Sequence, residues 1–188
     1  MDKAVKKMCL WLMLACLIML IVVPLKNKIE FSAYPLKYSQ FVNKYSEEYN
    51  VDKALIYAVI RTESSFKSNA ESNIGARGLM QLMPEAVDWI NLKSGFENTF
   101  EDMYNPETNI KYGAYMLKLL LAEFKSPENA LCAYHAGWGI TKEWLNNKEI
   151  SPDGQTIEKI PYSDTAWYVK TVLKARETYN KMYFEKGE

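Results

Sequence analysis

The sequence predicts one all-α, or nearly all-α, domain that follows an N-terminal membrane-spanning helix. Apolar side chains recur at spacings of three and four residues through most of the chain, as on one face of a helix. Several expected helix starts carry an Asp, Asn or Ser cap, and two of these caps are followed by proline, which is favoured in the first helical turn. No convincing run of alternating apolar and polar residues indicates a strand.

The N-terminal segment has the pattern of a membrane signal. Lys3, Lys6 and Lys7 precede an uncharged apolar run over residues 8–25. At about 1.5 Å per residue this run is roughly 27 Å long, close to the ~30 Å hydrocarbon core of a bilayer. No small-x-small cleavage site follows it. We therefore expect a cytoplasmic stub (residues 1–7), an uncleaved signal anchor (8–25), and an extracytoplasmic remainder; a cleaved signal peptide, a lipoprotein attached at Cys16 and a buried helix are less favoured alternatives.

Residues 26–36 read as a linker, and residues 37–188 as the folded domain. Apolar spacing predicts a first helix over about 38–49, and Asp52 is expected to cap a second that ends near Glu63. Further helices are expected from Pro84, after Asn105, and from Ser126 to Gly137. A short helix over 141–146 and a last one over about 163–183 complete the prediction.

Composition limits the classes of function. The formal net charge is zero, so nucleic acid is not an expected partner. Cys9, Cys16 and Cys132 do not form a disulfide framework or a metal-binding pattern, and His135 is the only histidine, which excludes a multi-histidine zinc site. We expect a monomer with no metal or cofactor. The thirteen tyrosines and five tryptophans suit core packing, and also the stacking of sugar rings.

Glu63 is the candidate for chemistry that the residue pattern itself suggests. It lies where an apolar helix gives way to a loop rich in Ser, Asn and Gly, which leaves room for a ligand. Apolar surroundings would raise the pKa of its carboxyl group towards the working range of a general acid. The position alone also fits an ordinary surface glutamate.

Four sequence blocks resemble a known family. The first is Glu63-Ser-x-Phe followed by Gly75-Ala-x-Gly-Leu-Met-Gln-x-Met-Pro, and the others lie at 109–117, 133–137 and 160–169. They resemble, in the same order, the blocks of soluble-lytic-transglycosylase-like domains, relatives of goose-type lysozyme. The resemblance spans about residues 51–174. It implies a lysozyme-like α domain that acts on the glycan strands of bacterial peptidoglycan. Together with the N-terminal apolar run, we expect this domain to be anchored at the cell membrane and to face the wall.

The resemblance also assigns roles by position. Glu63 corresponds to the family's single catalytic acid and base, and Ser72 to a serine that hydrogen-bonds the substrate. Gln81 and Met83 match residues of the groove that contact the sugars. Tyr134 matches a tyrosine whose hydroxyl hydrogen-bonds the catalytic carboxylate.

Two positions depart from the family pattern. His135 stands where the third block usually has asparagine, and we interpret it as a packed or surface residue rather than a catalytic one. Asp164 stands where the family commonly has a glutamate that contacts substrate or tethers the last helix. The shorter aspartate could instead cap that helix.

The implied reaction cleaves the β-1,4 bond between N-acetylmuramic acid and N-acetylglucosamine and leaves 1,6-anhydromuramyl ends. A muramidase of the same fold, in which water attacks the same bond, is the nearest alternative. The absence of an obvious second carboxylate near Glu63 argues for the transglycosylase, but Asp88, Glu97, Glu101 or Asp102 could lie closer than the sequence suggests. A third possibility is a non-catalytic, membrane-anchored module that binds glycan.

Overall fold

The computed structural model describes residues 31–185 without a break, together with residues 2, 7, 11–13, 18–20, 22 and 28. The chain divides into two compact units, residues 1–36 and 37–188. Most of the predicted anchor, 8–25, lies outside the described residues. Within the part of the chain that is described, no helix is both long enough and apolar enough to cross a membrane.

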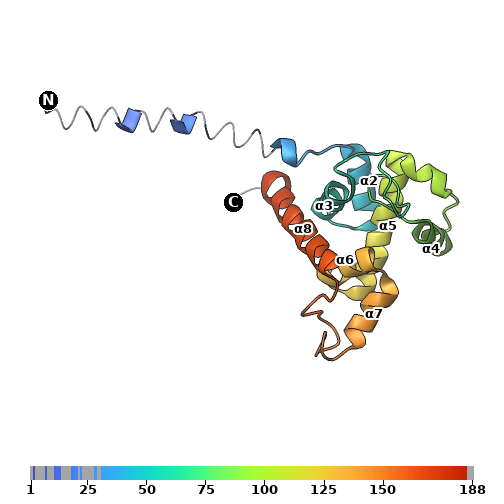
Figure 1. The fold of residues 1–188 in the computed structure, drawn as a ribbon. Helices are drawn as coiled ribbons and strands as arrows, with labels where there is room; N and C mark the ends of the chain where they lie inside the picture. The colour runs from blue at the N-terminus through green and yellow to red at the C-terminus, as the bar shows by residue number, and fades with distance from the viewer. Residues whose placement is uncertain are drawn as a thin grey trace. The chain divides into compact units, whose positions relative to one another are not determined.

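The second unit is built from helices, as Figure 1 shows. Among residues 31–185, β pairing is limited to two isolated bridges, Glu71 with Arg77 and Arg77 with Leu82. The prediction of a nearly all-α fold is therefore confirmed. The helices are α2 (Ser39–Tyr49), α3 (Lys53–Ser64), α4 (Pro84–Ser94), the 3₁₀ helix η1 (Phe100–Tyr104), α5 (Pro106–Phe124), α6 (Pro127–Ala136), α7 (Trp138–Asn146), α8 (Ser163–Tyr179) and the π-helical turn η2 (Asn180–Phe184).

The predicted caps form. The Asp52 carboxylate accepts a hydrogen bond from the backbone N–H of Ala54 at 2.9 Å. Asn105 accepts two backbone N–H groups at the start of α5, and Ser126 accepts one from Asn129 at the start of α6. These side chains satisfy backbone donors that lack a partner in the first helical turn, which is why such residues begin helices.

Two helix boundaries differ from the prediction, and one short helix was not predicted. Helix α7 begins at Trp138 rather than at 141, because Gly137 at φ 100° turns the chain sharply enough for α6 and α7 to follow each other without a linker. The unpredicted η1 starts with a capping box between Thr99 and Asp102. Regular α-helix ends at Tyr179, and the π turn that follows brings Phe184 within 6.2 Å of Tyr57, measured between ring centroids.

Helix α3 is the central element of this unit. Its residues 54–60 are all buried, and it packs against α8 and α2. Helix α5 packs against α2 and α6, and α6 packs against α7 and α8 (Figure 1). An ion pair of 2.5 Å between Arg176 Nε and Asp52 Oδ2 joins α8 to the start of α3. This ion pair and the packing of the two helices hold α3 and α8 together.

We predict that Gly78→Ala lowers the free energy of unfolding by about 2–4 kcal/mol, because of a clash in addition to backbone strain. Gly78 has φ 78°, and an added Cβ would lie 2.1 Å from the Met103 carbonyl oxygen. Gly75, at φ 89°, has nothing within 4 Å of such a Cβ. Gly75→Ala is therefore the control and should cost about 1 kcal/mol. Urea unfolding measures both, and equal losses would contradict the packing described here.

Candidate active site

Glu63 lies one residue before the end of α3, where the chain reverses direction. Ser65 and Phe66 both have positive φ angles, 50° and 64°, and Phe66 is buried. The Ser64 hydroxyl donates a hydrogen bond of 2.8 Å to the carbonyl of Leu79. The end of the helix is therefore attached directly to the far part of the following loop, residues 65–83.

The inner side of this loop is held by side chains of α5 and α6. Asn109 is fully buried, and its Oδ1 accepts the N–H of Met80 at 2.7 Å. Its Nδ2 donates to the carbonyls of Arg77 at 3.0 Å and Met103 at 2.9 Å. The Tyr134 hydroxyl donates to the Met80 carbonyl at 2.7 Å. Both polar groups of the Met80 residue are thus paired with side chains rather than with other backbone.

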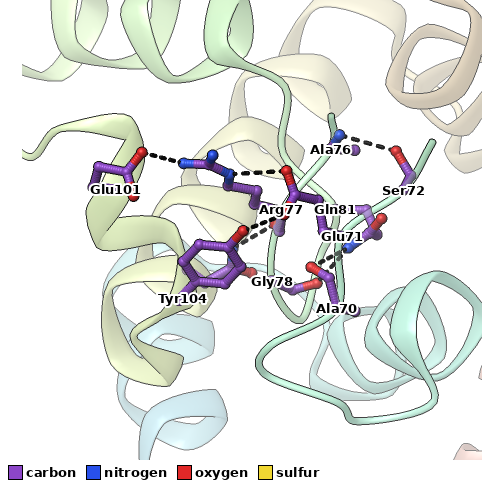
Figure 2. A network of polar contacts seen from close by, with 10 residues as sticks. Ala70, Glu71, Ser72, Ala76, Arg77, Gly78, Gln81, Glu101 and Tyr104 are labelled. Carbon is purple, nitrogen blue, oxygen red and sulfur yellow. Dashed lines mark hydrogen bonds and ion pairs between the residues drawn. The ribbon is translucent and has the colours of Figure 1, made fainter. Parts of the chain in front are cut away.

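The outer side of the loop contacts η1 through Arg77, as Figure 2 shows. The Arg77 guanidinium forms an ion pair of 2.6 Å with Glu101 and lies over the rings of Phe100 and Tyr104. The Tyr104 hydroxyl donates to Glu71 at 2.6 Å. Because Glu71 and Glu101 are exposed, each pair adds little stability, and their main effect is to fix the course of the loop.

Ser72 and Gln81 both make hydrogen bonds within the loop (Figure 2). Ser72 Oγ accepts the N–H of Ala76 at 2.9 Å. Gln81 Nε2 donates to the carbonyls of Ala70 at 3.2 Å and Gly78 at 2.9 Å. The predicted contacts with sugar would therefore be made by the Ser72 hydroxyl hydrogen and by Gln81 Oε1.

The environment of the Glu63 carboxyl group changes its acidity. Burial raises its pKa to about 7, and an interaction with the Tyr168 hydroxyl lowers that pKa in part. Tyr168 lies on α8 and is 2% exposed. Among the described residues, its hydroxyl has no partner with regular hydrogen-bond geometry, yet it lies close enough to Glu63 for the two to affect each other's pKa.

The hydrogen bond predicted from Tyr134 to Glu63 is not the one that forms, because the single hydroxyl hydrogen of Tyr134 is donated to Met80. Burial is the main cause that raises the pKa of Tyr134, and the charge of Glu63 raises it further, so the two groups are close. The tyrosine whose hydroxyl interacts with Glu63 is Tyr168, which the sequence interpretation missed as a site residue. Its position in the fourth family block was the available signal.

A second carboxylate does not contribute to the shift at Glu63, which arises from burial and Tyr168. Of the four candidates named from the sequence, Glu101 pairs with Arg77 and Asp102 caps η1. Asp88 and Glu97 are exposed. In residues 31–185, Glu63 is therefore the carboxyl group with the properties of a general acid.

A cavity of about 800 Å³ opens between α4, α5 and the junction of α6 and α7, and its lining does not include Glu63, Ser72 or Gln81. The predicted groove residue Met83 lies in its wall, as does Tyr134, which the resemblance assigned to the catalytic carboxylate. Aromatic and apolar side chains dominate the remaining lining: Trp89, Met116, Leu119, Leu120, Trp138 and His135. Three charged residues also line it: Glu85, Lys93 and Glu123. Such a wall suits a ligand with apolar faces and polar edges, as sugars have.

Asp164 is exposed in the first turn of α8, and its Oδ1 accepts the N–H of Thr165 at 2.8 Å. The N-cap position of α8 is held by Tyr162 without a side-chain capping bond, so Asp164 lies inside the first turn and is not the cap that the sequence suggested as one option. In the described residues, no three His, Cys, Asp or Glu side chains are grouped so that they could hold a metal ion.

Residues 40–156 match the model of a family described as "Transglycosylase SLT domain". The chain is 32% identical to the soluble lytic murein transglycosylase of Escherichia coli over 155 residues, which is 80% of this chain and 24% of the relative. It is 29% identical to the membrane-bound lytic murein transglycosylase C of Pectobacterium atrosepticum, over 77% of this chain and 47% of the relative. The chain thus spans about a quarter to a half of the length of these relatives.

The fold agrees with the sequence comparison. The crystal structure of the 70 kDa soluble lytic transglycosylase from Escherichia coli superposes with a TM-score of 0.76 at 28% identity. The matched region covers 84% of this chain and 26% of the other.

We predict that Glu63→Gln stabilises the protein above neutral pH and not below pH ~5. A carboxyl pKa of about 7 in the folded state, above the ordinary 4.5, favours folding at low pH, and this contribution is lost as pH rises through about 7. Glutamine is neutral throughout, so the variant should exceed the wild type by about 1–3 kcal/mol at pH 8. Urea unfolding at pH 4.5 and pH 8 measures this difference.

The control is Glu149→Gln, which changes an exposed residue. If the difference in stability between Glu63→Gln and the wild type is the same at both pH values, the raised pKa is refuted.

Proposed function

Because the chain belongs to the transglycosylase SLT domain family, we propose that it is a peptidoglycan lytic transglycosylase in which Glu63 is the catalytic acid and base. The observation that carries the proposal is the place of Glu63, a partly buried residue at the end of α3 beside the loop that the family match includes, where burial raises the pKa of its carboxyl group to about 7. Lytic murein transglycosylases among the relatives support the substrate class.

In the first step, protonated Glu63 donates its proton to the oxygen that links N-acetylmuramic acid to N-acetylglucosamine. The bond from the anomeric carbon to that oxygen breaks, and positive charge develops on the anomeric carbon. Since no second carboxylate contributes at the site in the described residues, the substrate's own 2-acetamido oxygen would shield this charge. A pKa near the working pH allows Glu63 to hold the proton before this step.

In the second step, the Glu63 carboxylate removes the proton from the 6-hydroxyl of the muramic acid. The freed oxygen bonds to the anomeric carbon and closes the 1,6-anhydro ring. Glu63 ends with the proton that it had at the start, and water is not consumed. The same pKa near 7 that favours donation also permits the group to accept a proton.

The glycan strand would lie along the loop and the adjoining cavity. Ser72 and Gln81 would contact the sugars near Glu63 through the atoms that their loop bonds leave available. Met83 and Tyr134 would line the continuation of the groove. Trp89 and Trp138, from α4 and α7, would stack against sugar rings further along the strand.

We further propose that residues 8–25 anchor the protein in the cell membrane, with residues 1–7 in the cytoplasm and the domain facing the wall. The lysines before the apolar run and the length of that run support this topology. A membrane-bound relative supports the location.

Product analysis tests the reaction. Digestion of purified peptidoglycan should release muropeptides with 1,6-anhydromuramyl ends, which are lighter by one water than reducing ends in mass spectrometry. Glu63→Gln should lower the rate by at least about a thousandfold, since proton transfer in both steps is lost, while binding to insoluble peptidoglycan persists. Reducing ends would instead identify a muramidase, and binding without release by the wild type would identify a glycan-binding module.

Membrane attachment is tested by carbonate extraction of membranes from expressing cells. The wild type should stay in the membrane pellet, whereas Leu14→Arg with Ile18→Arg should release it, because each arginine costs about 2.5–3.5 kcal/mol at the centre of a bilayer. The matched control is Leu14→Ala with Ile18→Val. Release of the wild type by carbonate would refute the anchor.

A further inference from the structure

His135 makes two contacts with α8 that tie it to the site. It lies in the last turn of α6, directly after Tyr134. The centre of its ring is 4.5 Å from that of Tyr168, with 32° between the ring planes. Its Nδ1 lies 3.0 Å from the hydroxyl of Thr165, whose residue is 1% exposed. Thr165 and Tyr168 are three positions apart on α8, so they share one face of the helix and His135 spans both.

We propose that His135 is a positioning residue, whose ring holds the Tyr168 hydroxyl beside the Glu63 carboxyl group. The inference rests on the proposed function, because the effect on catalysis is through Glu63. His135 itself has no contact with the reacting atoms in this proposal.

The Tyr168 hydroxyl needs such support because no regular hydrogen bond fixes it in the described structure. A buried hydroxyl without a good partner is held by the packing of its own ring. Stacked and tilted aromatic pairs have a preferred geometry at separations such as the one seen here. The bond between Nδ1 and Thr165 fixes the histidine ring in turn. Asparagine, the usual residue at this position in the family, has no aromatic ring that could pack against Tyr168.

The histidine acts in its neutral form at neutral pH. Burial lowers the pKa of His135, and the charge of Asp164 opposes this only in part. A neutral ring places no positive charge near Glu63 and so does not favour the ionised carboxylate. Three other titratable groups lie around His135: Glu63 on α3, Tyr134 on α6 and Tyr168 on α8. The charged residues that line the same cavity as His135 are Glu85, Lys93 and Glu123.

The first test compares His135→Asn with His135→Phe. Without the ring, the Tyr168 hydroxyl should leave Glu63, so the kcat of His135→Asn should fall about threefold to tenfold with little change in KM. Because the Tyr168 interaction lowers the Glu63 pKa, its loss should move the alkaline limb of the pH–rate profile to higher pH. His135→Phe keeps an aromatic ring, so its kcat and the position of its alkaline limb should be close to those of the wild type.

A double-mutant cycle with Tyr168→Phe separates positioning from general packing. Once the hydroxyl is removed, His135→Asn should have no further effect on kcat or on the alkaline limb. Independent, additive effects would overturn the proposal, as would a His135→Phe variant as defective as His135→Asn. Thermal unfolding of each variant shows whether a loss of kcat reflects a loss of folded protein.

A readout that needs no turnover keeps this inference distinct from the proposed function. The pKa of the Glu63 carboxyl group, followed by NMR in full-length protein, should rise in His135→Asn relative to the wild type. An unchanged pKa overturns the role of His135 even if the wild type makes anhydro ends. A raised pKa in a protein that releases no anhydro ends would support the positioning role while the proposed function failed.

Discussion

The buried side-chain amide of Asn109 is the interaction on which the candidate site depends most. Its hydrogen bonds to Met80 and Arg77 connect α5 to the loop, and its bond to Met103 connects α5 to η1. Backbone hydrogen bonds such as the pair between Arg77 and Leu82 close the loop on itself, and Asn109 fixes it to the rest of the domain. A fully satisfied buried amide is specific, because any displacement of the loop would leave polar groups unpaired away from water. Gly78 allows this close approach, since a Cβ at that position would overlap the Asn109 side chain. The loop can therefore expose polar atoms to a ligand and still keep one shape.

The rigid loop matters because it lies beside a carboxyl group whose acidity is set by opposing effects. Burial at the end of α3 disfavours the charged form of Glu63, while the Tyr168 hydroxyl favours it. The result is a pKa of about 7, which suits a group that must give and then take a proton. Packing of α3 against α8 determines both effects, since it buries the carboxyl group and supplies the tyrosine.

Local features of the fold could be predicted from the sequence, and long-range contacts could not. Asp52, Asn105 and Ser126 cap helices as expected, because capping involves only near neighbours along the chain. Glu63 was placed correctly at the end of α3. The interaction of Tyr168 with Glu63 escaped prediction, because it depends on long-range packing, as does the hydrogen bond that directs the Tyr134 hydroxyl to the Met80 carbonyl. The hydrogen bonds that Ser72 and Gln81 make within the loop could not be predicted for a similar reason. They depend on the closed shape of the loop, which also determines the positive φ of Gln81.

In the proposed reaction, one protein environment tunes the Glu63 carboxyl group for both proton transfers. The most direct measurement is the pKa of Glu63 in the wild-type chain, followed through the side-chain carboxyl ¹³C shift over pH 3–9 and assigned by the signal missing from Glu63→Gln. The structure predicts a midpoint at about 7. A midpoint near the ordinary glutamate value of about 4.3 would contradict the account, because a carboxylate ionised at rest could not be the acid of the first step.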